Sequence, residues 1–433
     1  MNYYSTNRRA PETSLREAVM RGLAPDRGLY MPRQIVPLPD VFFDSIGELS
    51  LTDVAYAAAM RFFGDDVPAD ALRAMVDDTL SFPIPLMPLG KHSFVLELFH
   101  GPTLAFKDVG ARFMARLLAH FVKKEGTDDV RVLVATSGDT GSAVANGFLG
   151  VPGIRVFVLY PKGKVSPMQE KQFTTLGQNI TALEVDGTFD DCQALVKAAF
   201  VDPVLTGRMC LTSANSINIA RLLPQSFYYF YAVARLRALG ITSPIVMSVP
   251  SGNFGNLTAG LIARRMGLPI ARFIAANNEN HPVFDYLHTG IYTPRPSVET
   301  MANAMDVGDP SNFARMLDLY GGDHLAMARD IQGDWSTDEM MADLINSTFR
   351  TEGYFLDPHG ACAYGALLRH LRRGEVGVFL ETAHPAKFGD TMRRVTGLDV
   401  PVPQRLAEFM RGTKQSVPMS RDYDDFRQYL LQC

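Results

Sequence analysis

The amino-acid sequence predicts an α/β protein whose core is parallel β-sheet covered by helices. Short apolar runs rich in Val, Ile, Leu or Phe recur along the chain, and amphipathic runs separate several of them. Each apolar run ends in small polar residues, and continuous apolar strands are typical of parallel sheets buried on both faces. The expected strands are SFVLELF 93–99, VRVLVATS 130–137, IRVFVLYP 154–161, ITALEVDG 180–187, RMCLTSAN 208–215, PIVMSVPSG 244–252, ARFIAANN 271–278 and VGVFLETAH 376–384.

The first 92 residues differ from the rest and predict a mainly helical extension. Ser14 precedes the run LREAVMR, and Gly22 follows it, which is the pattern of a capped helix. Two further amphipathic runs follow, LTDVAYAAAMRFFG 51–64 and ADALRAMVDDTLSF 69–82. The three prolines of SFPIPLMPLG 81–90 indicate a linker or an edge segment.

The chain after residue 93 is expected to form the catalytic region, 93–433. Within it we expect a smaller α/β subdomain at about 112–235, with the larger domain built from the remainder. Residues 288–313 carry few periodic cues and predict long loops near the site. The stretch 403–433 predicts helices on the surface.

Composition limits the classes of function. The 433 residues are 47% hydrophobic and 20% charged, and the formal net charge is −4. A mildly acidic chain favours neither nucleic acid nor an anionic membrane as partner. The N-terminus lacks the apolar run of a secretory signal, no stretch has about 18 consecutive apolar residues, and the four cysteines match no zinc site. We therefore expect a cytoplasmic enzyme that acts on a small molecule, without a metal.

Polar loops follow several expected strands, where ligands of parallel sheets bind. The first, FHGPTLAFKDVG 99–110, places Lys107 at the start of a helical run. A lysine amine must lose its proton to form an imine, and a partly apolar setting lowers its pKa. Taken alone, Lys107 is more often an exposed or ion-paired lysine.

Two loops are suited to binding anions. TSGDTGSA 136–143 offers glycines beside the hydroxyls of Thr136, Ser137, Thr140 and Ser142, before a helical run. SGNFGN 251–256 also lies between a strand and a helical run, and its main-chain N–H groups could cradle a phosphate. It matches neither nucleotide-binding glycine pattern. An ordinary capped turn remains the alternative for each loop.

Two further loops carry polar side chains. TSANSINIARLLPQ 212–225 contains Asn215, Ser216, Asn218 and Arg221, and an arginine can bind a carboxylate or a phosphate in bidentate fashion. The alternative is a helix capped by Ser216 with a solvated arginine. ETAHPAKF 381–388 contains Thr382 and His384, for which a strand-ending turn and a structural histidine are the alternatives.

The five loops, in this order, resemble those of threonine synthases, which are fold-type II enzymes dependent on pyridoxal phosphate (PLP). The combination of HGPTLAFKD, TSGDTGSA and GNFGN is specific, and the likeness runs along nearly the whole chain. It implies the tryptophan synthase β-like fold, with two parallel-sheet-rich α/β domains. GLAPDRGLYMP 22–32 resembles part of the additional N-terminal domain of one branch of the family.

The resemblance also implies residue roles. Lys107 would be the Schiff-base lysine and the main proton carrier, Thr382 would face the pyridine nitrogen, and Asp139 would border the ring. The cofactor phosphate would be held by Gly252, Asn253, Phe254, Gly255 and Asn256. The substrate carboxylate would be bound by Thr136, Ser137, Gly138 and Thr140, and the substrate phosphate by Asn215, Ser216 and Arg221, with support from Lys162.

The implied reaction converts O-phospho-L-homoserine and water into L-threonine and phosphate by γ-elimination and β-addition of water, which is the last step of threonine biosynthesis. PLP would be the electron sink. This branch implies a monomer. Three alternatives stay open: a serine or threonine dehydratase, a phospholyase that makes no threonine, and a PLP-binding protein without catalysis.

Overall fold

A computed structural model describes residues 1–125 and 129–433. The chain forms two compact units. The larger unit contains Met1 and residues 31–106 and 222–401, and the smaller contains residues 2–30, 107–221 and 402–433. Residues 107–221 of the smaller unit overlap the expected subdomain at about 112–235. The expected N-terminal segment, 1–92, is divided between the two units instead of forming one compact body.

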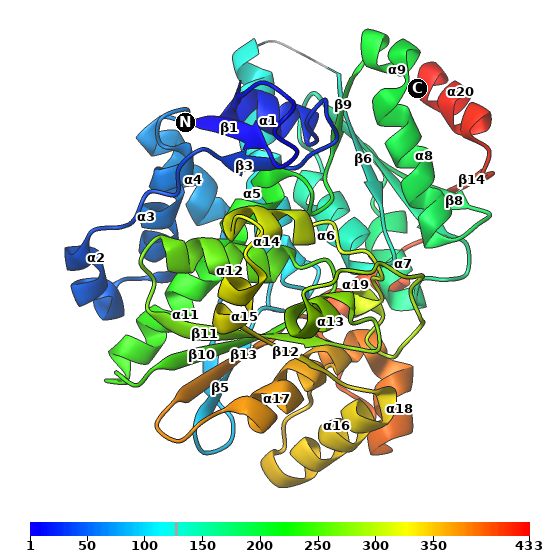
Figure 1. The fold of residues 1–433 in the computed structure, drawn as a ribbon. Helices are drawn as coiled ribbons and strands as arrows, with labels where there is room; N and C mark the ends of the chain where they lie inside the picture. The colour runs from blue at the N-terminus through cyan, green and yellow to red at the C-terminus, as the bar shows by residue number, and fades with distance from the viewer. Residues whose placement is uncertain (126–128) are drawn as a thin grey trace. The chain divides into compact units, whose positions relative to one another are not determined.

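A mixed sheet forms the centre of the larger unit (Figure 1). Its strands are β4 (Leu86–Pro88), β5 (Ser93–Glu97), β10 (Ile245–Pro250), β11 (Ile270–Asn277), β12 (Ile331–Trp335) and β13 (Val376–Glu381). Among the described residues the order is β12-β11-β10-β13-β5-β4. All neighbours are parallel except β4, which pairs with β5 in the antiparallel sense. The proline-rich segment is therefore an edge strand, as expected.

Helices cover both faces of this sheet. On one face α17 (Pro358–His370) packs against β10, β11 and β13, and on the other lie α11 (Ser226–Ala238) and α12 (Gly255–Arg265) (Figure 1). The other helices of this unit are α2 (Asp40–Ser45), η1 (Ile46–Glu48), α3 (Leu51–Phe63), α4 (Ala69–Thr79), η2 (Leu223–Gln225), α13 (Pro282–Thr289), η3 (Asn303–Met305), α14 (Phe313–Leu319), α15 (His324–Asp330), α16 (Asp338–Glu352), η4 (Pro385–Phe388) and α18 (Gly389–Thr396).

The smaller unit contains a parallel sheet. Its strands are β6 (Val130–Ala135), β7 (Ile154–Pro161), β8 (Ile180–Val185), β9 (Cys210–Ser213) and β14 (Val417–Met419). In the part of the chain that the structure describes, they follow the order β14-β8-β7-β6-β9. Every residue of β6 is buried, as a strand covered on both faces requires.

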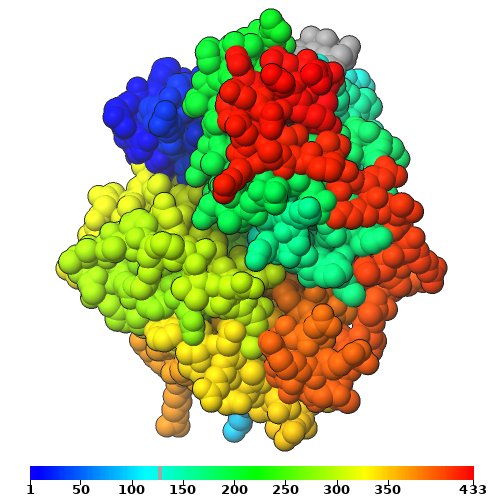
Figure 2. All heavy atoms as spheres, turned by 90° about the vertical axis from the view of Figure 1, so that its right-hand side faces the viewer, coloured from blue at the N-terminus to red at the C-terminus, as the bar shows by residue number. Residues whose placement is uncertain are grey.

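Helices of the smaller unit flank that sheet on two sides (Figure 1). Its helices are α1 (Leu15–Arg21), α5 (Lys107–Glu125), α6 (Asp139–Phe148), α7 (Pro167–Thr174), α8 (Phe189–Val201), α9 (Pro203–Arg208), α10 (Ile219–Leu222, whose last residue belongs to the larger unit), α19 (Gln404–Arg411) and α20 (Tyr423–Gln432). α20 packs on α8 and α9, so the C-terminal helix covers residues from the middle of the sequence (Figure 2). One apolar cluster joins Leu133 and Phe157 of the sheet to Leu195 of α8 and Phe426 of α20.

The N-terminal residues contain short strands that the sequence did not indicate. β1 (Asn2–Ser5) and β2 (Thr13–Ser14) pair in the antiparallel sense, and at β3 (Tyr30–Pro32) the chain passes from the smaller unit to the larger. The expected helix after Ser14 is present as α1. The Ser14 side chain accepts from the Glu17 amide, and Gly22 ends the helix at a φ of 70°.

Within the described residues, no helix combines the length and apolar character needed to cross a membrane.

Candidate active site

Lys107 is the first residue of α5, where the helix dipole is positive. The side chain is half-buried, and the neighbouring Asp108 is buried. A lysine at a helix start, with its side chain partly shielded from solvent, is a candidate for imine formation with an aldehyde.

The segment that leads into Lys107 lies beside Thr382. The amide of Phe106 donates to the carbonyl of Thr382 (2.9 Å), and the amide of His384 donates to the carbonyl of Leu104 (3.0 Å). Ala105 and Ala383 form an antiparallel bridge. Two loops that are almost 280 residues apart in sequence are thus hydrogen-bonded immediately before the lysine.

The buried carboxylate of Asp357 is hydrogen-bonded to the turn that contains Thr382. Asp357 caps α17 by accepting from the amides of His359 and Gly360, and its other oxygen accepts from the amide of Ala383 (3.0 Å). The Glu381 carboxylate accepts from the amide of Asp357. Burial, followed by the charge of Asp357, raises the pKa of Glu381 well above its usual range. Asp357 and Glu381 thus tie the Thr382 turn to the start of α17.

His384 has a structural role, in agreement with the alternative named for it above. Its Nδ1 accepts from the amide of Ala386 (3.1 Å) and caps η4. Burial, followed by the charge of His100, lowers the pKa of His384 to about 4. The ring is neutral at pH 7, as an acceptor at Nδ1 must be.

The glycine-rich loop joins β10 to α12 and is held on several sides. Asn256 donates from Nδ2 to the carbonyl of Pro250 (2.8 Å), and Tyr229 donates to the carbonyl of Asn256 (2.9 Å). Phe254 adopts a left-handed backbone with a φ of 59°, which is costly for an aromatic residue. Such a conformation persists where the surrounding contacts over-determine it, and here it turns the chain into the start of α12.

The same loop fits a phosphate. A Cβ added at Gly252 would lie 2.7 Å from the carbonyl oxygen of Ala304 and 2.9 Å from Cα of Met305, so glycine is required for this close approach. Gly255 and Asn256 open an 11-residue helix, whose first N–H groups have no carbonyl partner within the helix. Backbone donors and a helix dipole are the features that hold the phosphate of a cofactor such as PLP.

The turn at 136–143 follows β6 and opens α6. The Thr136 hydroxyl accepts from the amides of Gly138 (2.9 Å) and Gly141 (2.8 Å), so it shapes the turn. Gly138 has a φ of 146°, and a Cβ there would meet the Gln169 side chain at 2.6 Å. Gln169 also donates to Asp139 (3.0 Å). Thr136 is buried in the turn, whereas Ser137 and Thr140 are partly exposed and better placed for a ligand.

The segment at 212–221 joins the same end of the smaller unit's sheet. Asn215 donates from Nδ2 to the carbonyl of Ala135 at the end of β6 (2.9 Å). Thr212 and Asn218 both donate to the carbonyl of Val19 in α1, which ties the N-terminal extension to this segment. The tie to Val19 could not be read from the sequence, because no pattern near residue 19 points to a partner 200 residues away.

Arg221 is buried, with 3% of its surface exposed, so a solvated arginine is excluded. Its guanidinium donates to the carbonyl of Ala214. A Cβ at Gly110 would lie 2.6 Å from the Arg221 carbonyl oxygen and 3.2 Å from its Nε, so Arg221 lies against the first turn of α5. Burial lowers the pKa of Arg221 to about 10, and the charge of Asp108 opposes that effect. The group stays cationic at pH 7.

Each unit thus gathers one part of the predicted site. The smaller unit contains Lys107 and Asp108 at the start of α5 and the segments 136–140 and 215–221; Arg221 lies against α5, and Asn215 bonds the end of β6. In the larger unit, Thr382 and the loop 251–256 follow the neighbouring strands β13 and β10. Lys162 is exposed at the carboxyl end of β7. Gln169, Asp357 and Glu381 were not among the residues predicted from the sequence. Of these, only Asp357 stands in a local pattern, an Asp-Pro step that is typical of a helix start.

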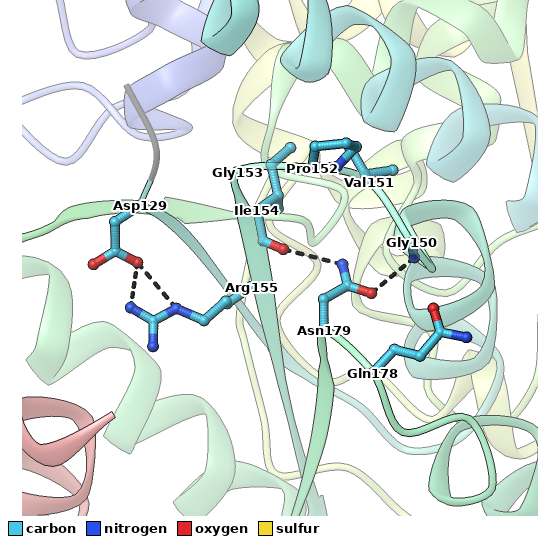
Figure 3. A pocket seen from close by; sticks show the side chains of 9 residues that line it. All are labelled: Asp129, Gly150, Val151, Pro152, Gly153, Ile154, Arg155, Gln178 and Asn179. Carbon is cyan, nitrogen blue, oxygen red and sulfur yellow. Dashed lines mark hydrogen bonds and ion pairs between the residues drawn. The ribbon is translucent and has the colours of Figure 1, made fainter. Parts of the chain in front are cut away.

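A surface pocket of 520 Å³ lies at the opposite end of the smaller unit's sheet (Figure 3). It is lined by Asp129, Gly150, Val151, Pro152, Gly153, Ile154, Arg155, Gln178 and Asn179. These residues precede or begin β6, β7 and β8, whereas the loops described above follow the strands. Asn179 already bonds the backbone at Gly150, Phe148 and Ile154, and Arg155 pairs with Asp129. This pocket is distinct from the candidate site.

Three family models match the chain. The model described as pyridoxal-phosphate dependent enzyme matches residues 82–380, threonine synthase N terminus matches 2–80, and threonine synthase, C-terminal matches 360–430. The threonine synthase of Haemophilus influenzae is 43% identical over 434 residues, with all of both chains covered. That of Escherichia coli is 44% identical over 411 residues, covering 94% of each chain.

Solved structures agree along the whole length. The crystal structure of threonine synthase from Escherichia coli has a TM-score of 0.94 at 41% identity and covers all of both chains. The PLP-bound threonine synthase from Brucella melitensis has a TM-score of 0.93 at 34% identity and covers all of this chain and 99% of that one. Maize serine racemase, with a TM-score of 0.55 at 15% identity, shares the fold alone. The chain belongs to the threonine synthase family of pyridoxal-phosphate dependent enzymes.

Proposed function

We propose that this chain catalyses the conversion of O-phospho-L-homoserine and water to L-threonine and phosphate. The observation that carries the proposal is full-length similarity, at more than 40% identity, to threonine synthases, in a chain whose Lys107 directly follows the segment hydrogen-bonded to Thr382. A threonine deaminase and maize serine racemase match at 16% and 15% identity, and they support only the fold.

The cofactor would be held by four groups of this chain. Lys107 would bind it covalently through its amine, and the backbone N–H groups of Gly252–Asn256 would bind its phosphate. Thr382 would place a neutral hydroxyl at the ring nitrogen, and Asp139 would border the ring. When bound, PLP supplies an electron sink for the carbanion that forms next to the substrate amino group.

The substrate would be oriented by the smaller unit. Ser137, Gly138 and Thr140 would bind its carboxylate at the start of α6, while Thr136 shapes that turn. Asn215, Ser216 and the cationic Arg221 would bind its phosphate, with support from the charge of Lys162. These two anion sites hold the molecule at both ends, so that the bonds between them face Lys107.

Lys107 would then carry protons between the substrate carbons. It would remove the proton from Cα and then one from Cβ, which permits phosphate to leave from Cγ. A proton is delivered to Cγ, and water adds its hydroxyl at Cβ and a proton at Cα. The sum consumes one water and releases one phosphate for each L-threonine.

We further propose that residues 1–92 act as the threonine-synthase-type N-terminal domain of a catalytic region spanning 93–433. The protein would work as a monomer in the cytoplasm, without a nucleic-acid or membrane partner. A mass measurement in solution under assay conditions tests the monomer, and a dimer would contradict it.

Borohydride reduction of the PLP-loaded protein, followed by peptide mapping, tests the assignment of Lys107. The label is expected on Lys107. Lys107→Ala should lose the label and the activity, whereas Lys91→Ala, a change at an exposed lysine, should keep both. A label on another lysine, or full activity in Lys107→Ala, would remove the basis of the proposal.

A further inference from the structure

A buried arginine stands behind the glycine-rich loop. Arg315 in α14 has no exposed surface and is among the largest fully buried side chains of the described residues. Its Nη1 donates to Oδ1 of Asn312 (2.7 Å), and Asn312 is also fully buried. Burial lowers the pKa of Arg315 to about 9, so the guanidinium keeps its charge at neutral pH.

Asn312 connects this charge to the loop. Its Nδ2 donates to the carbonyl of Asn253 (3.0 Å), while Oδ1 of Asn253 accepts from the amide of Ser311 (2.6 Å). Both the backbone and the side chain of Asn253 are therefore fixed by the segment 311–312. A chain of two hydrogen bonds runs from the Arg315 guanidinium to the backbone of the glycine-rich loop.

This arrangement has two consequences for an anion at the loop. The donors to Asn253 hold its peptide groups in one orientation, so less order is lost when a ligand binds. A positive charge in a buried, weakly screened setting attracts a phosphate more strongly than an exposed arginine would. Both effects act on a phosphate, and the electrostatic one does not act on a ligand without a phosphate.

We propose that Arg315, acting through Asn312, is a positioning residue that sets the selectivity of the loop for the phosphate of PLP. The inference rests on the proposed assignment of Gly252–Asn256 as the phosphate site. Neither residue belongs to the loop motif. Asn312 lies in the segment 288–313, whose sequence carries few periodic cues, and Arg315 lies just after it.

The decisive variant is Asn312→Asp. Its carboxylate still accepts from Arg315 and forms a buried ion pair, so folding of the apo-protein should be retained. It can no longer donate to Asn253, and it cancels the positive charge behind the loop. Arg315→Gln removes the charge directly, and Arg315→Lys restores it. Asn346→Asp, in α16 of the same unit, is the matched control for an added negative charge.

The measurement is the ratio of the dissociation constants of pyridoxal and PLP for the apo-protein, obtained by titration of absorbance. We expect the ratio to fall at least tenfold in Asn312→Asp and Arg315→Gln, chiefly through weaker PLP binding. Arg315→Lys should recover most of it, and Asn346→Asp should stay within twofold of the wild type. Thermal unfolding of each apo-protein shows whether a change in the ratio comes from loss of fold. If Arg315→Gln does not fold, the ratio measured for Asn312→Asp alone tests the proposal.

Gly252→Ala distinguishes failure of this inference from failure of the site assignment. If Gly252→Ala lowers the ratio while Asn312→Asp leaves it unchanged, the loop binds the phosphate but Arg315 and Asn312 do not set its selectivity. If neither variant changes the ratio, the loop is not the phosphate site, and the assignment falls together with the inference. An equal loss of pyridoxal and PLP binding in Asn312→Asp would show a purely structural role and would also overturn the proposal.

Discussion

Replacing Arg221 by alanine should cost both stability and substrate affinity. Arg221 is 3% exposed and Asp108 is 1% exposed, and the charge of Asp108 acts on the arginine. Removing one member of a buried charge pair leaves the other uncompensated, at a cost of about 3–5 kcal/mol. We therefore expect the free energy of unfolding of Arg221→Ala to fall by about that amount in urea.

The effect on substrate is expected to be separable from the effect on stability. A hydrogen bond to a charged group contributes about 1.5–3 kcal/mol, which corresponds to a roughly 10- to 150-fold rise in KM for O-phospho-L-homoserine. Arg221→Lys keeps the charge and should lose less than half of the stability that Arg221→Ala loses, while KM still rises. KM is to be measured at low temperature, where the variants remain folded.

Arg208→Ala is the matched control, since Arg208 ends α9 on the exposed surface of the same unit. Its free energy of unfolding should stay within about 0.5 kcal/mol of the wild type. A stability loss below about 1 kcal/mol in Arg221→Ala would refute the buried-pair reasoning. A normal KM in a folded Arg221→Ala would refute its contribution to phosphate binding.

Three other changes test separate parts of the structure. Gly138→Ala should lower the free energy of unfolding by about 2 kcal/mol or more, because its positive φ disfavours alanine and the added Cβ would meet the Gln169 side chain. Gly163 also has a positive φ but open space around it, so Gly163→Ala should lower the free energy of unfolding by only about 1 kcal/mol. Thermal unfolding of the two variants compares these costs. The folded pKa of His384 is depressed to about 4, so its stability contribution is present above pH 6.5 and is lost as the pH falls toward 4. After discounting for the partial exposure of the ring, we expect the free energy of unfolding, measured by urea titration, to fall by about 2 kcal/mol between pH 6.5 and pH 4 because of His384. If stability depends on pH in His384→Asn as steeply as in the wild type, this expectation is contradicted. Ser14→Ala removes the cap of α1 and should cost about 1 kcal/mol in the same assay, and an unchanged midpoint would refute the cap.

Much of the fold could be predicted because its signals are local. Eight expected strands are present as β5–β11 and β13, since each is a continuous apolar run between turns. β12 was missed because its sequence, IQGDW, mixes apolar and polar residues, and its position is set by pairing with β11. β14 was missed for a similar reason: VPM is three residues long, and its pairing with β8 joins segments more than 230 residues apart.

The candidate site divides along the same line. Lys107, the loop 251–256 and Thr382 stand in motifs that the sequence displays. The groups that hold these residues in place do not stand in such motifs. Asp357 and Glu381 support the Thr382 turn, and Arg315 acts on the glycine-rich loop through Asn312. Their roles depend on burial and on contacts between distant segments, which no local pattern encodes. The exposure of Arg221 was equally unreadable, because a helix start permits either a solvated or a buried arginine.

The most direct test of the central claim is to supply the PLP-loaded protein with O-phospho-L-homoserine and to measure phosphate and L-threonine in the same samples. The proposed function predicts that the two products appear in equal amounts and that both depend on Lys107. Phosphate released with a keto acid and without L-threonine would identify a phospholyase instead, and it would contradict the assignment made here.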